Sequence, residues 1–180
     1  MRGHEIGRRS PPILLGGTLL LAAGLRLWHL GAKPLWFDES WSAFIARQPV
    51  ETIPRLLRLY DHLPPLHYLL LNIWVGLFGT GEAALRLPSV LAAVAAVGAT
   101  FFLAERVAGP GVALLAAALL AVSPFQVAAA QEARTYPLIT LFILGAAYGL
   151  WRGVEEGGRR FWVVYAGSLL LAFYTHHFSF

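Results

Sequence analysis

Two adjacent carboxylates lie in the segment Trp36-Phe37-Asp38-Glu39-Ser40, which follows the first long apolar stretch of the chain. Charged groups beside apolar stretches of membrane length are costly unless they face water or line a site. A carboxylate held close to a hydroxyl group can take its proton, and such general-base catalysis contributes about 10²–10⁴-fold to a rate. The pair therefore predicts a site at a membrane surface, and Asp38 is its candidate base.

Further polar groups interrupt the apolar sequence at three places. They are Arg55, Arg58, Asp61 and His62; then Glu132, Arg134 and Tyr136; and finally His176 and His177. Guanidinium groups can make paired contacts to a phosphate, and histidines can join carboxylates such as Glu39 or Asp61 around a divalent metal ion. Adjacent histidines point in different directions on a helix, so His176 and His177 are weak candidates for metal ligands. A divalent metal ion is the one cofactor that the sequence suggests, and it is not required by the site.

Each of these residues also has a structural explanation. Asp38 is a favoured type of helix N-cap, although a cap does not account for Glu39. Asp61-His62 can form a solvated turn before the prolines, and Glu132 with Arg134 can form an ion pair at the end of a span. Glu82 and Arg86 are four residues apart and are expected to pair on one helix. His67 is expected to pack at the membrane interface. A catalytic site is favoured because the polar groups are predicted to converge on one membrane face.

The composition requires a membrane protein. Of the 180 residues, 57% are hydrophobic and 13% are charged, whereas charged residues usually make up about 25% of a soluble domain. The chain has no cysteine, which excludes disulfides, thiolate nucleophiles and Cys-based metal sites. Its basic residues flank apolar stretches, a pattern that sets membrane topology and argues against a nucleic-acid partner. The predicted class is all-α, a polytopic transmembrane helical protein.

Five membrane spans are expected in a single membrane-embedded domain over residues 1–180. They cover about residues 13–30, 87–104, 111–130, 137–152 and 161–176. A sixth apolar stretch, residues 65–78, lies between Pro64-Pro65 and Gly79-Thr80-Gly81. It is shorter than the roughly 20 residues that cross a bilayer, so it is expected to lie in the interface within a long outer loop, residues 31–86.

The arginines support this topology. Three groups of them lie at Arg2, Arg8 and Arg9; at Arg106; and at Arg152, Arg159 and Arg160. If residues 65–78 do not cross, all three groups fall on the cytoplasmic side, as the positive-inside rule prefers. The same topology places Asp38, Asp61 and Glu132 together on the outer side, which predicts one aqueous site facing out from a bacterial plasma membrane.

Local patterns predict two short helices in the outer loop and one kink. Apolar residues cluster on one side of residues 36–45, and the stripe Ile53, Leu56, Leu57 and Tyr60 has helical spacing. Both helices are expected to lie flat against membrane lipids, with Arg55 and Arg58 on the polar side of the second. Ser123-Pro124 predicts a kink in the fourth span, because proline removes a helical hydrogen bond.

Several motifs, in their order along the chain, resemble the GT-C-fold membrane glycosyltransferases. The motifs are Trp36-Phe37-Asp38-Glu39, Asp61-His62-Leu63-Pro64-Pro65-Leu66-His67-Tyr68, Phe78-Gly79, Glu82, Leu85-Arg86-Leu87-Pro88-Ser89, residues 116–124, and Gln131-Glu132-Ala133-Arg134-Thr135-Tyr136. The nearest branch is similar to the protein O-mannosyltransferases, the lipid A aminoarabinose transferases and their bacterial relatives. The match covers about residues 30–137, the greater part of the chain.

The resemblance implies a GT-C-like amino-terminal module that transfers a sugar from a polyprenyl-phosphate-linked donor. The acceptor would be a lipid, glycan or protein on the outer face. Asp38 matches the family's catalytic acid. Glu39, Asp61, His62, Glu132 and Arg134 match positions that shape the site, with Arg55, Arg58 and Tyr136 as further substrate-contacting candidates. Such enzymes usually invert the sugar in one displacement, so Asp38 is expected to act as a base in hexosyl or pentosyl transfer.

The alternative function is a polytopic transporter or flippase of lipid-linked substrates. Such proteins place charges along the pathway, near the midpoints of spans, and only Arg26 approaches that position here. A non-catalytic scaffold would explain the spans but not the acidic pair.

Relatives in the family are much longer, and the chain ends in an apolar run without a helix stop. We therefore expect the amino-terminal part of a longer enzyme.

Overall fold

The computed structural model describes residues 12–176, and these residues form nine helices and no strand. The helices are α1 (Pro12–Leu27), α2 (Phe37–Ala46), α3 (Ile53–Tyr60), α4 (Leu66–Phe78), α5 (Glu82–Ala108), α6 (Pro110–Val122), α7 (Pro124–Ala130), α8 (Tyr136–Glu156) and α9 (Arg159–Phe173). The all-α class is confirmed. So are the two short loop helices, α2 and α3, which were predicted from their apolar patterns.

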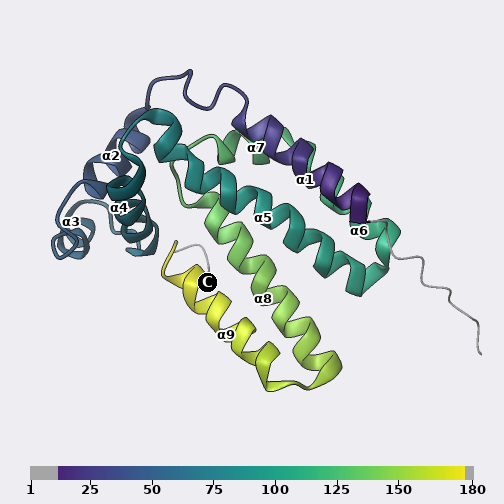
Figure 1. Ribbon diagram of the computed structural model, residues 1–180. Coiled ribbons are helices and arrows are strands. Elements are labelled where there is room, and N and C mark those ends of the chain that lie inside the picture. Colours follow the sequence, from purple (N-terminus) through teal and green to yellow (C-terminus); the bar gives the residue numbers. More distant parts are fainter. Residues whose placement is uncertain (1–11, 177–180) are drawn as a thin grey trace, which may run out of the picture.

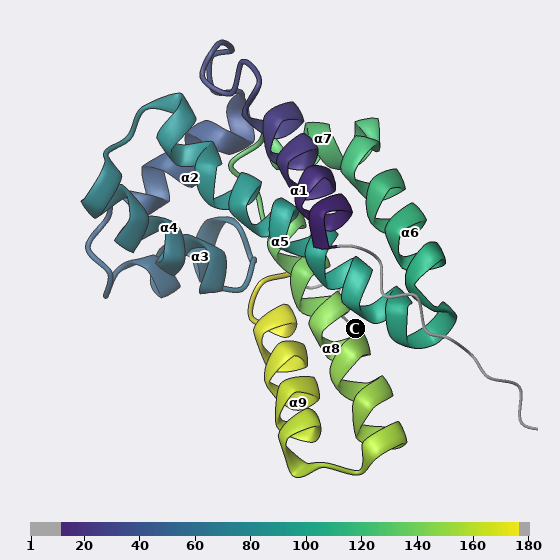
Figure 2. The same ribbon diagram turned by 45° about the vertical axis from the view of Figure 1, so that its right-hand side comes forward.

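Helices α1 and α5 to α9 form one part of the structure, and α2, α3 and α4 form the other (Figure 1). Helix α5 packs against α1, α6 and α8, and α9 packs against α8. Helices α2, α3 and α4 gather at one end of this bundle in both ribbon views (Figures 1 and 2). The other end carries the α5–α6 junction and the α8–α9 turn, where Arg106, Arg159 and Arg160 lie. Arg2, Arg8 and Arg9 are outside the described residues.

Among the described residues, two helices, α5 and α8, are long and apolar enough to cross a membrane. Helices α6 and α7 qualify together as a third span, and they meet at an angle of 59°. The kink predicted at Ser123-Pro124 is thus confirmed. Helices α1 and α4 are shorter apolar helices of 16 and 13 residues. The crossings predicted for residues 13–30 and 161–176 stay predictions, as does an interfacial position for α4.

Helix α5 begins at Glu82, five residues before the expected span at residue 87, so Arg86 is helical. Pro88 lies inside this helix and lacks the N–H that would bond the carbonyl of Ala84. The indole Nε1 of Trp74 donates to that carbonyl instead, at 2.9 Å. This bond attaches α4 to α5 at the point where proline weakens the helix.

The break between α6 and α7 is closed by a residue of α1. Pro124 has no N–H for the carbonyl of Leu120, and the buried Arg26 donates to that carbonyl at 3.1 Å and to the carbonyl of Ala121 at 2.8 Å. The side chain of Gln131, just after α7, donates in turn to the carbonyl of Trp28 at 2.8 Å. These contacts fix the direction in which the chain leaves α7 and enters residues 131–135.

Candidate functional site

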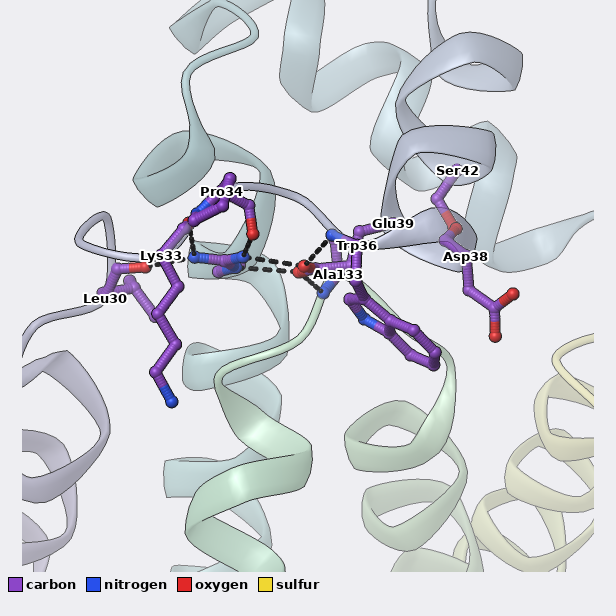
Figure 3. Close-up of polar contacts among 9 residues, drawn as sticks. Leu30, Lys33, Pro34, Trp36, Asp38, Glu39, Ser42 and Ala133 are labelled. Carbon is purple, nitrogen blue, oxygen red and sulfur yellow. Dashed lines mark hydrogen bonds and ion pairs between the residues drawn. The ribbon is translucent and has the colours of Figure 1, made fainter.

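Asp38 and Glu39 lie in the first turn of α2 but face different surroundings (Figure 3). Successive side chains on an α-helix are about 100° apart, so the two carboxylates diverge. The Glu39 side chain is 1% exposed, whereas that of Asp38 is 36% exposed. Trp36, not Asp38, is the N-cap of α2, so the capping explanation for Asp38 is wrong.

Glu39 accepts four hydrogen bonds within the protein. Arg86 donates two of them, from Nε to Oε1 and from Nη2 to Oε2, both at 2.7 Å. The backbone N–H of Ala133 donates at 2.9 Å and that of Trp36 at 3.4 Å. Burial by itself raises the pKa of Glu39, but the bonds from Arg86 and Ala133 outweigh burial and hold the pKa below its ordinary value.

Arg86 uses all of its hydrogen-bonding capacity on this end of the protein. A guanidinium group has five N–H donors. Besides its two bonds to Glu39, Arg86 donates to three backbone carbonyls of the α1–α2 loop, those of Leu30 at 2.8 Å, Lys33 at 2.9 Å and Pro34 at 3.2 Å. The prediction that Arg86 pairs with Glu82 is wrong, because a partner 47 residues away outcompetes the neighbour on its own helix.

The Glu39–Arg86 pair therefore joins three segments: the α1–α2 loop, α5, and residues 131–135. Figure 3 shows Glu39 beside Trp36 and Ala133, with Leu30, Lys33 and Pro34 on the far side of the dashed bonds. This geometry makes Glu39 a positioning residue. Its predicted contact with substrate stays a prediction.

Asp38 forms an ion pair with Arg134, which lies in the segment 131–135 bonded to Glu39. The Nη2 atom of Arg134 lies 3.5 Å from Oδ2 of Asp38, and the Arg134 side chain is 13% exposed. The guanidinium group of Arg134 also lies 5.9 Å from the ring centroid of Tyr136. The structural explanation for Arg134 was an ion pair with Glu132, but its ion pair within residues 12–176 is with Asp38. A carboxylate, a guanidinium and a phenol thus meet at one end of the bundle.

A second polar cluster joins the end of α3 to the start of α4. The hydroxyl of Tyr68 donates to Asp61, and burial together with this carboxylate raises the pKa of Tyr68. His67 is 3% exposed. Burial and then the charge of Arg134 lower the pKa of His67 to about 4, so its imidazole is neutral at pH 7. Sequence reasoning missed Tyr68 and the burial of His67, although both belong to the Asp61–Tyr68 motif.

The remaining predicted residues are not all brought together. Arg55 and Arg58 are exposed on α3. Arg58 and His62 line a cavity of about 410 Å³, which Asp38 does not line. His62 has a positive φ of 58°, a strained conformation for a non-glycine residue. Glu132 is half-buried, and burial together with the charge of Glu39 raises its pKa.

The suggested metal ion finds no set of ligands in the described part of the chain. Residues 12–176 contain no group of three histidine, aspartate or glutamate side chains close enough to hold one. His176 is buried with its ring centroid 6.1 Å from that of Tyr136, and His177 lies outside the described residues. The described residues therefore do not form a metal site.

Comparisons with known proteins agree with the resemblance seen in the sequence. A curated relative, the undecaprenyl phosphate-alpha-4-amino-4-deoxy-L-arabinose arabinosyl transferase of Edwardsiella ictaluri (strain 93-146), is 30% identical over 156 residues. The alignment covers 81% of this chain and 28% of the relative, so the chain spans less than a third of the relative's length. No solved structure matches.

A family model also matches the chain, that of the dolichyl-phosphate-mannose-protein mannosyltransferases, over residues 62–179. The match begins after α2 and so excludes Asp38 and Glu39, but it includes Arg86, Glu132 and Arg134. It covers well over half of the chain, and the helices include two or three that could span a membrane. The chain is an integral membrane protein that belongs to the dolichyl-phosphate-mannose-protein mannosyltransferase family.

Proposed function

We propose that this chain forms part of a membrane glycosyltransferase that moves a sugar from a polyprenyl-phosphate donor to an acceptor hydroxyl, with Asp38 as the base. The family match and the donor lipid in the relative's name support this reaction class. The observation that carries the proposal is the difference between the two neighbouring carboxylates. Glu39 is buried in structural bonds, whereas Asp38 stays accessible beside Arg134.

The reaction needs a proton acceptor and a cation. Asp38 would take the proton of the acceptor hydroxyl, and the oxygen would bond to the anomeric carbon as the bond from that carbon to the phosphate oxygen breaks. The leaving phosphate gains negative charge, and a guanidinium group held nearby stabilises it. Arg134 is our candidate for this role, because it lies next to Asp38 and its side chain is partly accessible. A single displacement would invert the anomeric centre, for a hexosyl or a pentosyl group alike.

Other residues receive supporting roles in the proposal. Tyr136 lies under the guanidinium of Arg134 and would restrict where that group can point. Asp61, held by Tyr68, would supply a second carboxylate for hydroxyl groups of the sugar or acceptor. Arg55, Arg58 and His62 lie on the exposed side of α3 and the turn after it, where a lipid phosphate approaching from the membrane surface would meet them.

The distribution of charge favours a transferase over a transporter. A transport pathway requires charged groups along the spans, yet the acidic and basic candidates gather at the end of the bundle that holds α2, α3 and α4 (Figure 2). Arg26 is the exception inside an apolar helix, and it bonds backbone carbonyls at the α6–α7 break. We infer that the end of the bundle with Asp38 faces outward from a bacterial plasma membrane, where a lipid, glycan or protein acceptor would reach it.

The test is Asp38→Asn in membranes from cells that express the complete reading frame. Transfer of sugar from a polyprenyl-phosphate donor is expected to fall by about 10²-fold or more, because the amide cannot take a proton. Asp38→Glu should retain part of the activity. Glu51→Gln, at an exposed acid in the turn before α3, is the matched control and should leave transfer unchanged. Near-normal transfer by Asp38→Asn would remove Asp38 from the mechanism.

A further inference from the structure

A cavity of about 650 Å³ lies beside the Glu39–Arg86 pair. Its walls come from the end of α1, the loop that follows it, and α7 with the first residues after α7. Asp38 and Arg134 do not line it. The cavity is therefore separate from the pair of residues that the proposed reaction uses, although it lies at the same end of the bundle.

The cavity is apolar in one part and charged in another. Leu25, Val127 and Ala128 line it from the two apolar helices, and the exposed residues Trp28 and Trp36 line it as well. Lys33 and Glu132 supply charge of opposite sign. Tryptophan is enriched where membrane proteins meet the head groups of lipids, so this combination fits a molecule that is apolar at one end and charged at the other.

Neither charged side chain is held by a bond within the described part of the chain. Within residues 12–176, the ammonium of Lys33 and the carboxylate of Glu132 make no hydrogen bond or ion pair. Figure 3 shows the Lys33 side chain extending away from the ion pair near its backbone. Arg86 cannot donate a hydrogen bond to either group, because its five donors are occupied, although its charge acts on Glu132. Burial raises the pKa of Glu132, and the charges of Arg134 and Arg86 offset this only in part, so a cationic ligand beside this half-buried carboxylate would stabilise its charged form.

We propose that this cavity binds the head group of a membrane phospholipid that carries both a phosphate and an ammonium group. The phosphate would lie at Lys33, the ammonium at Glu132, and the acyl chains along α1 and α7. An anionic lipid without an ammonium group would place its phosphate near Glu132 and leave that carboxylate unpaired. The proposed reaction assigns the polyprenyl-phosphate donor to Asp38, which does not line this cavity. The site is independent of the proposed transfer reaction.

The test measures lipid retention on the protein with its complete reading frame, purified from mixed bilayers and examined by native mass spectrometry. Phosphatidylethanolamine should be retained over phosphatidylcholine, whose quaternary ammonium cannot donate a hydrogen bond, and over phosphatidylglycerol, which has no ammonium. Losing one charge-assisted hydrogen bond is expected to weaken retention about tenfold. Lys33→Gln and Glu132→Gln should each have this effect, whereas Arg47→Gln and Glu51→Gln, at exposed positions after α2, should not.

Two results would overturn the proposal. One is equal retention of the three lipids by the unaltered protein, and the other is unchanged retention by Lys33→Gln and Glu132→Gln. Displacement of phosphatidylethanolamine by a polyprenyl phosphate would assign the cavity to the donor and would overturn it as well. Lys33 is exposed, so Lys33→Gln still provides a test if Glu132→Gln does not fold.

Discussion

Replacement of Glu39 by glutamine should destabilise the protein far more than the loss of an ordinary surface ion pair. The carboxylate is 1% exposed and accepts two bonds from Arg86 and two from backbone N–H groups. A glutamine offers one acceptor oxygen and turns an NH₂ group toward the donors of Arg86. Breaking a buried pair by removing one partner costs about 3–5 kcal/mol. At about 2–4 °C per kcal/mol, the melting temperature should fall by about 6–20 °C.

The measurement is thermal unfolding in detergent, followed by tryptophan fluorescence of the protein with its complete reading frame. Arg152 and Glu156 provide a matched control, since they form an Arg–Glu pair at 2.6 Å on α8 and Glu156 is 36% exposed. Glu156→Gln should leave the melting temperature nearly unchanged, because exposed pairs contribute little. If Glu39→Gln and Glu156→Gln lower the melting temperature equally, the three-segment role of Glu39 is refuted.

Arg86 provides the second half of the same experiment. Arg86→Lys keeps the charge but has three donors and no planar fork, so this variant should also melt at a lower temperature than the unaltered protein. Arg86→Met should lower the free energy of unfolding more than Glu39→Gln does, because it also leaves the carbonyls of Leu30, Lys33 and Pro34 without their donor.

The stabilisation by Glu39 should depend on pH. The pKa of Glu39 is lowered in the folded protein, so its stabilising contribution is present above its unfolded pKa and is lost as the pH falls through the folded pKa.

Two further predictions concern pH and topology. Between pH 7 and pH 5 the unfolded chain binds more protons at His67 than the folded protein does, because the folded pKa of His67 is about 4. The free energy of unfolding should therefore be about 2 kcal/mol lower at pH 5 than at pH 7. This loss should be absent in His67→Gln, which is checked by melting both proteins at both pH values. The chain has no native cysteine, so single cysteines can report the side of the membrane. A membrane-impermeant maleimide should label Glu51→Cys from outside and Arg106→Cys only after permeabilisation. Labelling of both variants from one side would contradict the proposed orientation.

The sequence predicted those parts of the fold that depend on neighbouring residues. The stripe from Ile53 to Tyr60 defines α3 to the residue, because helical spacing is a local signal. The kink at Ser123-Pro124 follows from proline alone. Arg26, which compensates for this kink by bonding Leu120, gave no such signal. Its partner is 94 residues away, and only packing of α1 against the α6–α7 break identifies it.

The ion pairs of the candidate site could not be predicted for the same reason, because their partners are distant in sequence. Spacing of four residues made Glu82 the expected partner of Arg86, and an ion pair with Glu132 at the end of a span was the structural explanation for Arg134. Both of these partners are close in sequence. The actual partners are Glu39 and Asp38, and both come from α2. No local pattern reveals that α2 packs against the start of α5 and the segment after α7.

The roles of Asp38 and Glu39 depend on each other through helix geometry. Because consecutive side chains diverge by about 100°, turning Glu39 toward Arg86 necessarily turns Asp38 away from the buried pair. The bond from Ala133 to Glu39 then holds residues 131–135 against α2, and this brings Arg134 to Asp38. A glutamine at position 39 should therefore reduce catalysis through the position of Arg134, even though it leaves the proposed base in place. In the proposed mechanism the acidic pair serves both tasks, since Glu39 fixes the geometry that Asp38 uses.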